Sequence, residues 1–149
     1  MGTATVSATW TSPTGSQCVA TGSGGHSIVM DAQSGRAGWA GFKPSEVLLA
    51  ALLGCTGVDF TSILAKQRQE VTRISAEVHA EQDEVPPWPF RRIEIVFTVE
   101  GRNLDERAVE RALSLAVDRY CSVGATLAGT ADISHRVVVI SSKPAAVAA

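Results

Sequence analysis

The stretch PSEVLLAALLGC, at residues 44–55, decides how this chain folds. Pro44 and Ser45 are typical of a helix start, because proline suits the first turn and a serine hydroxyl can accept a bond from its free amides. Glu46 adds a carboxylate where the helix dipole is positive. The pattern predicts one helix from Ser45 to Gln67, roughly 34 Å long at about 1.5 Å per residue.

The first half of this helix is apolar on every side, which predicts burial on every side. A domain of 149 residues has little with which to surround such a helix, whereas two copies of the chain can cover it. We therefore expect a long buried central helix in a homodimer. The apolar run itself extends from Val47 to Val58 and is shorter than the ~18 residues that a membrane span needs, so we expect no membrane association.

The bulk composition is that of a globular protein. The chain has 149 residues, of which 45% are hydrophobic and 19% are charged, and we expect one domain over residues 1–149. Its net charge of −2 offers no excess of cations to neutralise phosphates, which argues against nucleic acid as a partner. The N-terminus lacks a basic segment followed by an apolar one, so we expect a soluble, cytoplasmic protein.

Alternating residues predict strands on both sides of the helix. Before it, Gly22 to Gly25 is interpreted as a hairpin turn, because this run lacks the lysine and the spacing of a phosphate-binding loop. After it, an amphipathic second helix is expected, capped by Asp105 and ending near Cys121-Ser122-Val123-Gly124. The predicted strands cover residues 3–11, 16–21, 26–30, 72–81, 91–100 and 133–140. The fold class is therefore α+β in the order βββ-α-ββ-α-β, followed by a disordered tail at about residues 142–149.

The chain has three cysteines, a number that does not make a disulfide framework. Cys18 lies on a predicted strand and is interpreted as structural. Cys55 lies in the apolar helix, where a thiol is either an inert core residue or, beside a cation or an opening to solvent, a reactive one. Arg36, in the loop before the helix, is one candidate cation. Cys121 is either a packing residue or a partner that condenses with a sulfenic acid on Cys55.

Two segments that carry these cysteines resemble segments of a known family. Residues 44–55 look like the peroxidatic-cysteine helix of the OsmC/Ohr family, and residues 59–64 continue the match. Tyr120-Cys121-Ser122-Val123 looks like the resolving-cysteine segment of that family. The resemblance covers roughly residues 26–140 and is greatest to the YhfA-like branch.

The resemblance implies an OsmC-like fold in an intertwined homodimer, with the two long helices at its centre and two active sites at the subunit interface. It implies a thiol-dependent peroxidase, an oxidoreductase of the oxidative stress response that reduces organic hydroperoxides with Cys55 as nucleophile and Cys121 as resolving thiol. It also implies no metal and no organic cofactor. The reductant would be a dithiol such as a lipoylated or thioredoxin-like protein.

The resemblance assigns a glutamate and an arginine to the catalytic group, and the candidates here are Glu46 and Arg36. The Ohr glutamate follows the proline directly, at the position of Ser45 in this chain. Glu46 is displaced by one residue, which turns its side chain by about 100° on a helix. The alternative for Glu46 is a first-turn residue that favours the helix dipole. Arg36 is either the active-site arginine or a surface residue.

Aromatic residues in the loop at residues 83–90 complete the candidate site. Trp88 and Phe90 are either a wall of the substrate pocket for an apolar hydroperoxide or ordinary loop packing. The histidines lie on separate predicted strands, and His79 with Glu81 supplies too few ligands for a metal site. A different function also stays open, in which the same dimeric scaffold is a non-catalytic module that binds a small ligand or senses redox state.

Overall fold

The computed structural model describes residues 2–11, 15–32 and 40–142. The chain divides into two compact units, Met1–Ala50 and Ala51–Ala149, and each unit holds one three-stranded sheet. Arg36 and the tail after Ser142 lie outside the described residues. The catalytic cation, the disordered tail and the single domain over residues 1–149 therefore stay predictions.

The first unit contains an antiparallel sheet. Its strands, in sheet order, are β1 (Val6–Trp10), β2 (Cys18–Gly22) and β3 (Ser27–Met30). The glycine run forms the predicted hairpin turn, in which the Gly22 N–H donates to the His26 carbonyl at 3.0 Å. Gly25 adopts a φ of 78°, a left-handed conformation that glycine reaches without steric cost. Cys18 is buried on β2.

The helix α1 spans Pro44–Lys66, within one residue of the predicted bounds. A bond at its start explains where it begins, because the backbone N–H of Lys43 donates to Glu46 Oε2 at 3.1 Å. Amides at a helix start have no partner in the helix itself, and a carboxylate three residues on satisfies one of them. Glu46 thus caps the start of α1, and its catalytic role stays a prediction.

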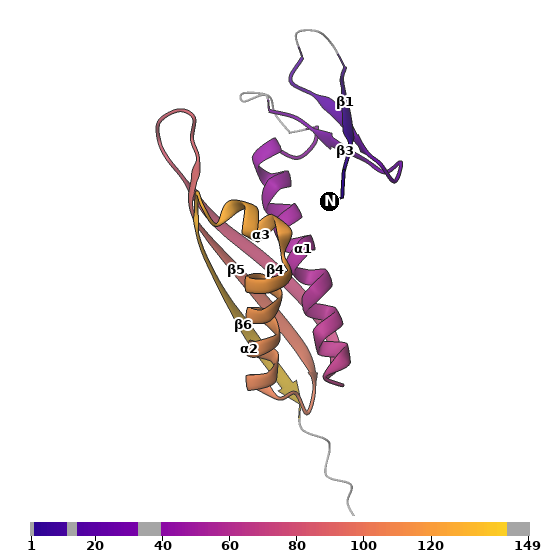
Figure 1. The fold of residues 1–149 in the computed structure, drawn as a ribbon, viewed down its shortest axis with the longest axis vertical. Helices are drawn as coiled ribbons and strands as arrows, with labels where there is room; N and C mark the ends of the chain where they lie inside the picture. The colour runs from indigo at the N-terminus through magenta and orange to yellow at the C-terminus, as the bar shows by residue number, and fades with distance from the viewer. Residues whose placement is uncertain (1, 12–14, 33–39, 143–149) are drawn as a thin grey trace, which may run out of the picture. The chain divides into compact units, whose positions relative to one another are not determined.

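The second unit contains a sheet in the order β4-β5-β6 (Figure 1). Its strands are β4 (Glu70–Gln82), β5 (Phe90–Arg102) and β6 (Asp132–Ser142). The central strand β5 runs antiparallel to β4 and parallel to β6. A parallel neighbour needs a crossover connection, which the helical segment between β5 and β6 supplies. Ser142, expected at the start of the tail, ends β6 and donates its hydroxyl to the Gly101 carbonyl at 3.2 Å.

The core of this unit lies between the sheet and the helices on one of its faces. The alternation predicted for β5 is confirmed, and its core-facing residues, each at most 2% exposed, are Ile93, Ile95, Phe97 and Val99. Phe60 of α1 packs edge-on against Phe97, with ring centroids 5.0 Å apart and planes at 72°. The buried residues of α1 recur at every fourth position and are Leu52, Thr56, Phe60 and Leu64. One face of the helix therefore enters the core.

The crossover is not the single helix that was expected. It consists of α2 (Glu106–Leu115), a π-helical turn η1 (Ala116–Tyr120) and a short helix α3 (Ser122–Leu127). Between η1 and α3, Cys121 is extended, with φ −72° and ψ 100°. The predicted end of the second helix near Cys121 agrees with this break, whereas the short helix α3 that follows it was not expected.

The other face of α1 is uncovered within the chain. In the second unit its exposed residues are Ala51, Gly54, Val58, Thr61, Ser62, Ala65 and Lys66. Five of them, Ala51, Gly54, Val58, Thr61 and Ala65, recur at spacings of three and four and form one stripe. Val58 is 72% exposed, and nothing lies within 4 Å of the place where a Gly54 side chain would be. This stripe of small and apolar side chains is the part of α1 that the chain itself does not bury.

The helix as a whole is longer than the apolar run from which the absence of a membrane span was predicted. An 18-residue window within Pro44–Lys66 has a mean hydropathy of 1.9 and is 22% buried. By length and composition α1 is able to cross a membrane, a test that the core helix of a soluble protein also passes. A membrane span and the core helix of a soluble protein differ in what covers the helix, and the sequence of the helix does not distinguish them.

Candidate active site

The two candidate reactive cysteines meet in the second unit. Cys55 is half-buried on α1, and Cys121 is 2% exposed in the link between η1 and α3. Both are free thiols, and they lie close enough for each to shift the pKa of the other. The fold thus joins two residues that lie far apart in the sequence, and it does so because α3 crosses α1 at the level of Cys55.

Two hydroxyl contacts hold this crossing. The Thr56 hydroxyl donates to Cys121 Sγ at 3.4 Å, and Thr56 is fully buried. Ser122 Oγ lies 3.8 Å from Cys55 Sγ. Each cysteine is followed by a hydroxyl residue, and each hydroxyl contacts the sulfur of the other cysteine. We call Cys55, Thr56, Cys121 and Ser122 the crossed quartet.

Hydrogen bonds lower the pKa of the Cys55 thiol. The largest cause is the backbone N–H of Val123, and burial opposes it. The Cys121 thiol and the hydroxyl and amide of Ser122 act in the same direction as Val123. The donors are neutral groups, three of them in the first turn of α3. A thiolate at Cys55 is therefore favoured by hydrogen bonding to its charged form.

The pKa of Cys121 moves the other way. Burial is the largest cause and raises it, while hydrogen bonds from Thr56 and Gly124 partly offset that effect. The neighbouring Cys55 raises it further, because two thiolates in contact repel each other. The pair is thus unequal: Cys55 is the thiol that ionises more readily, and Cys121 is the one kept protonated.

Cys121 also has a structural task. Its Sγ accepts the backbone N–H of Gly124 at 3.2 Å and so acts as the N-cap of α3. Caps of this kind satisfy amides that a helix leaves free, and oxygen side chains usually supply them. A side chain added at Gly124 would place its Cβ 3.4 Å from Cys121 Sγ. The resolving candidate is therefore tightly enclosed.

Three of these residues were not found from the sequence: Thr56, Ser122 and Gly124. From the sequence, Thr56 is one more core position on the helix that carries Cys55. Ser122 and Gly124 lie at the predicted end of the second helix, where no contact with Cys55 is expected. The signal that was available is local, since serine and glycine directly after Cys121 are poor residues for the middle of a helix.

The remaining predicted site residues are Glu46, Arg36, Trp88 and Phe90. Glu46 is in the first unit and accepts a bond from Lys43, and Arg36 is outside the described residues. Trp88 is 54% exposed in the β4–β5 loop, and Phe90 begins β5 half-buried. Figure 1 shows this loop projecting beyond the end of the sheet at which α3 also lies. The catalytic and substrate-binding roles of these four residues stay predictions.

The polar residues weighed for a metal site have other partners. His79 contacts Glu77 at 3.5 Å, and Glu81 pairs with Arg92 at 2.6 Å. His135 Nε2 lies 3.1 Å from the Ser114 hydroxyl of α2. Within the residues that the structure describes, no group of three or more histidine, cysteine or acidic side chains is arranged to hold a metal ion.

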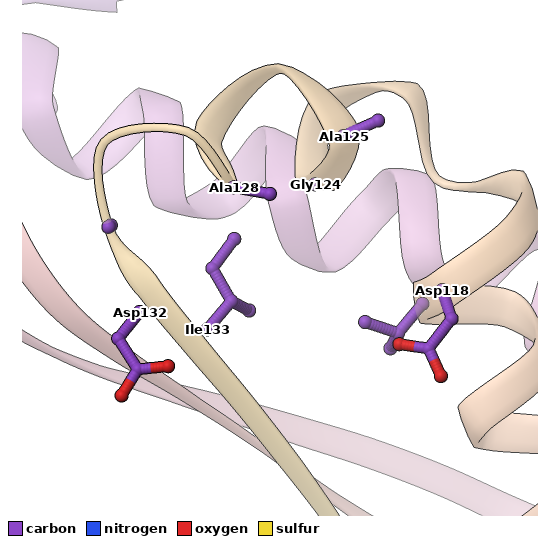
Figure 2. A pocket seen from close by; sticks show the side chains of 8 residues that line it. Asp118, Gly124, Ala125, Ala128, Asp132 and Ile133 are labelled. Atoms are coloured by element: carbon purple, nitrogen blue, oxygen red, sulfur yellow. The ribbon is translucent and has the colours of Figure 1, made fainter.

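A pocket of about 370 Å³ adjoins α3 (Figure 2). Gly124 forms part of its wall, and the carboxylates of Asp118 and Asp132 stand on opposite sides of it (Figure 2). The remaining lining residues are Val117, Ala125, Ala128, Ala131 and Ile133. Through Gly124 this pocket borders the amide that Cys121 caps.

Comparisons with known proteins agree with this arrangement. Residues 35–136 match the family described as OsmC-like protein. Protein YhfA of Escherichia coli strain K12 is 38% identical over 117 residues, which cover 78% of this chain and 85% of that relative.

Solved structures share the fold over nearly the whole chain. A hypothetical protein from Aquifex aeolicus VF5 has a TM-score of 0.82 at 27% identity, over 95% of this chain and 99% of its own. The organic hydroperoxide resistance protein OhrB of Bacillus subtilis has a TM-score of 0.60 at 21% identity, over 92% and 98% of the two chains. The expected α+β class and arrangement are confirmed by these likenesses.

Proposed function

This chain belongs to the OsmC family, and from that premise we propose that it is a thiol peroxidase that reduces organic hydroperoxides. Membership relates it to the response to oxidative stress, since organic hydroperoxide resistance proteins share its fold. The fold is that of a soluble protein, in which α1 is a core helix. In the proposed reaction Cys55 is the nucleophile and Cys121 the resolving thiol.

One observation carries the proposal, namely the set of donors around Cys55. Cys55 is half-buried, and hydrogen bonds from the first turn of the helix that Cys121 caps lower its pKa. A peroxidatic cysteine needs a thiolate at neutral pH, access for the peroxide and a second thiol nearby. The Val123 amide and the crossed quartet favour the thiolate with neutral donors, and the quartet places a second thiol beside a half-buried Cys55.

The first step oxidises Cys55. Its thiolate attacks the terminal hydroxyl oxygen of the hydroperoxide, an S–O bond forms and the O–O bond breaks. The alkoxide that leaves takes up a proton and becomes an alcohol, and Cys55 becomes a sulfenic acid. The peroxide is reduced by two electrons, which come from sulfur.

The second step forms a disulfide. The Cys121 sulfur attacks the sulfur of the Cys55 sulfenic acid, an S–S bond forms and the S–O bond breaks. The hydroxide that leaves combines with the proton of the Cys121 thiol to give water. A dithiol reductant, a lipoylated or thioredoxin-like protein, then returns both cysteines to thiols by exchange. The proposal needs no metal and no organic cofactor.

The proposed working form is an intertwined cytoplasmic homodimer. The exposed stripe on α1, which includes Gly54, supports this, because small residues let two helices approach closely. A second copy would also bury the apolar surface that one chain leaves open. In such a dimer Trp88 and Phe90 would form the wall of the hydroperoxide pocket, and Arg36 with Glu46 would complete the catalytic group.

The test is a thiol count after oxidation. Reduced protein is mixed with cumene hydroperoxide, and free thiols and intact mass are measured without reductant. We expect the loss of two thiols out of three, one alcohol formed per disulfide, and Cys18 left reduced. Cys55→Ser should abolish the reaction, and Cys121→Ser should stop it at the sulfenic acid.

A matched control is Cys18→Ser, which removes a thiol that lies outside the proposed chemistry. Wild type and Cys55→Ser consuming peroxide at the same slow rate would overturn the enzymatic function. That outcome would favour the non-catalytic module that binds a small ligand or senses redox state on the same scaffold.

A further inference from the structure

We propose that Thr56 is a positioning residue for the second step of the reaction, in which its hydroxyl holds the Cys121 sulfur in place and favours its attack on oxidised Cys55. This inference rests on the proposed function. It concerns a residue that contacts neither the peroxide nor the sulfur that the peroxide oxidises.

The geometry supports a specific task for the Thr56 hydroxyl. Thr56 lies on α1 directly after Cys55 but is fully buried, and its hydroxyl donates to Cys121 Sγ at 3.4 Å. The other bond to this sulfur, from the Gly124 N–H at 3.2 Å, comes from the α3 side. Thr56 is therefore the donor that ties Cys121 to the helix on which its target lies.

The chemistry of the step explains why such a donor matters. Cys121 is 2% exposed, and burial disfavours a thiolate. Attack on a sulfenic acid nevertheless proceeds through the thiolate. A hydroxyl that donates to sulfur stabilises the charge as it develops, and it fixes the distance to Cys55. The titratable group that acts on Cys121 is Cys55 itself, whose charge is lost once it is oxidised.

The opposite hydroxyl has a different place in the cycle. Ser122 contacts Cys55 Sγ at 3.8 Å and is exposed, so it serves the thiol that reacts first. Thr56 serves the thiol that reacts second. The crossed quartet thus assigns one hydroxyl to each step, and the two roles are separable by substitution.

The test separates the two steps in single-turnover experiments. Reduced protein receives one equivalent of cumene hydroperoxide, and mass spectrometry of quenched samples follows the sulfenic acid and the disulfide. In Thr56→Val, which keeps the shape and removes the hydroxyl, we expect the rate of disulfide formation relative to sulfenic acid formation to fall about 10-fold or more, the scale of a lost hydrogen bond to a charged group.

Two further readouts distinguish positioning from mere packing. The pH at which disulfide formation reaches half its maximal rate should rise in Thr56→Val, and excess peroxide should convert more Cys55 to sulfinic acid because the sulfenic acid persists. Thr56→Ser should restore the wild-type ratio. Thr72→Val is the matched control, since it removes an exposed hydroxyl that donates to the Glu100 carbonyl at 3.1 Å.

The possible failures are distinguishable. If Cys55 of the wild type forms no sulfenic acid, the proposed function itself is wrong. A second failure concerns Thr56 alone. If the wild type completes both steps, and a Thr56→Val variant that circular dichroism shows to be folded has the wild-type ratio of the two rates and the wild-type pH of half-maximal disulfide formation, the role of Thr56 is overturned. If Thr56→Val does not fold, Thr56→Ser and Thr56→Ala are compared, and equal ratios in these two variants overturn the role.

Discussion

Ser122 Oγ lies 3.8 Å from Cys55 Sγ, so the residue that follows one candidate cysteine contacts the other. The contact exists because Cys121 is extended and turns the chain from η1 into α3, whose first amides then face α1. Activation of Cys55 by these donors does not require a nearby cation. Glu46 caps the start of α1, and its part in the catalytic group stays a prediction.

Substitution of Ser122 tests this activation. Ser122→Ala removes the hydroxyl, and Ser122→Pro removes both the hydroxyl and one amide. Proline fits the first position of α3, and the extended Cys121 before it suits a residue that precedes proline. We expect the pKa of Cys55 to rise in both variants and more in Ser122→Pro, measured by the pH dependence of alkylation at Cys55. An unchanged titration in both would show that α3 does not activate the thiol.

The two thiols should titrate in a fixed order. The pKa of Cys55 is lowered, chiefly by the Val123 N–H, and that of Cys121 is raised, chiefly by burial. With rising pH, iodoacetamide should therefore modify Cys55 below the ordinary cysteine range and Cys121 only above it, as peptide mass spectrometry can follow. In the unfolded protein both should react alike. Earlier modification of Cys121 would contradict the assignment of roles.

The same shift has a consequence for stability. Because the folded state lowers the pKa of Cys55, its contribution to the free energy of unfolding is fully present above the unfolded-state pKa and is lost as the pH falls through the folded-state pKa. Cys55→Ser should remove this contribution, so the stability difference between wild type and variant should widen with pH over that window. Denaturation at a series of pH values measures it.

The exposed stripe of α1 tests the proposed homodimer. Gly54 has nothing within 4 Å of the position of a Cβ, so Gly54→Arg should fold as a single chain but prevent close approach of a second α1. We expect sedimentation to report a dimer for the wild type and a monomer for the variant. Gly129→Arg is the control, since Gly129 is equally open but lies after α3. A dimeric Gly54→Arg would place the interface elsewhere.

The start of α2 offers a test of local stability. Asp105 Oδ1 accepts the Ala108 N–H at 3.0 Å and caps the helix. Asp105→Ala should lower the free energy of unfolding by about 1 kcal/mol, as measured by urea denaturation, because the amide loses its partner. Asp105→Asn keeps an oxygen acceptor and should lose much less. Equal losses in the two variants would mean that the charge rather than the cap is important.

Much of the fold follows from local patterns. The bounds of α1, the hairpin at Gly22 to Gly25 and the alternation of β5 were predicted because burial on one face imposes a period of two on strands, and because prolines and glycines mark where elements begin and turn. The end of the second helix near Cys121 was predicted, but the short helix α3 that follows it was not.

The sequence by itself determined that this chain has two cysteines in segments that resemble those of the family. One of them lies in a helix so apolar that a single chain of this length has little with which to cover it. Only the tertiary structure decided which groups surround those sulfurs. Thr56, Ser122 and the amides of α3 become partners of the cysteines because a parallel crossover returns the chain across α1. A hydrogen bond depends on distances of about 3 Å, and no periodicity along a chain encodes a distance between residues so far apart in it.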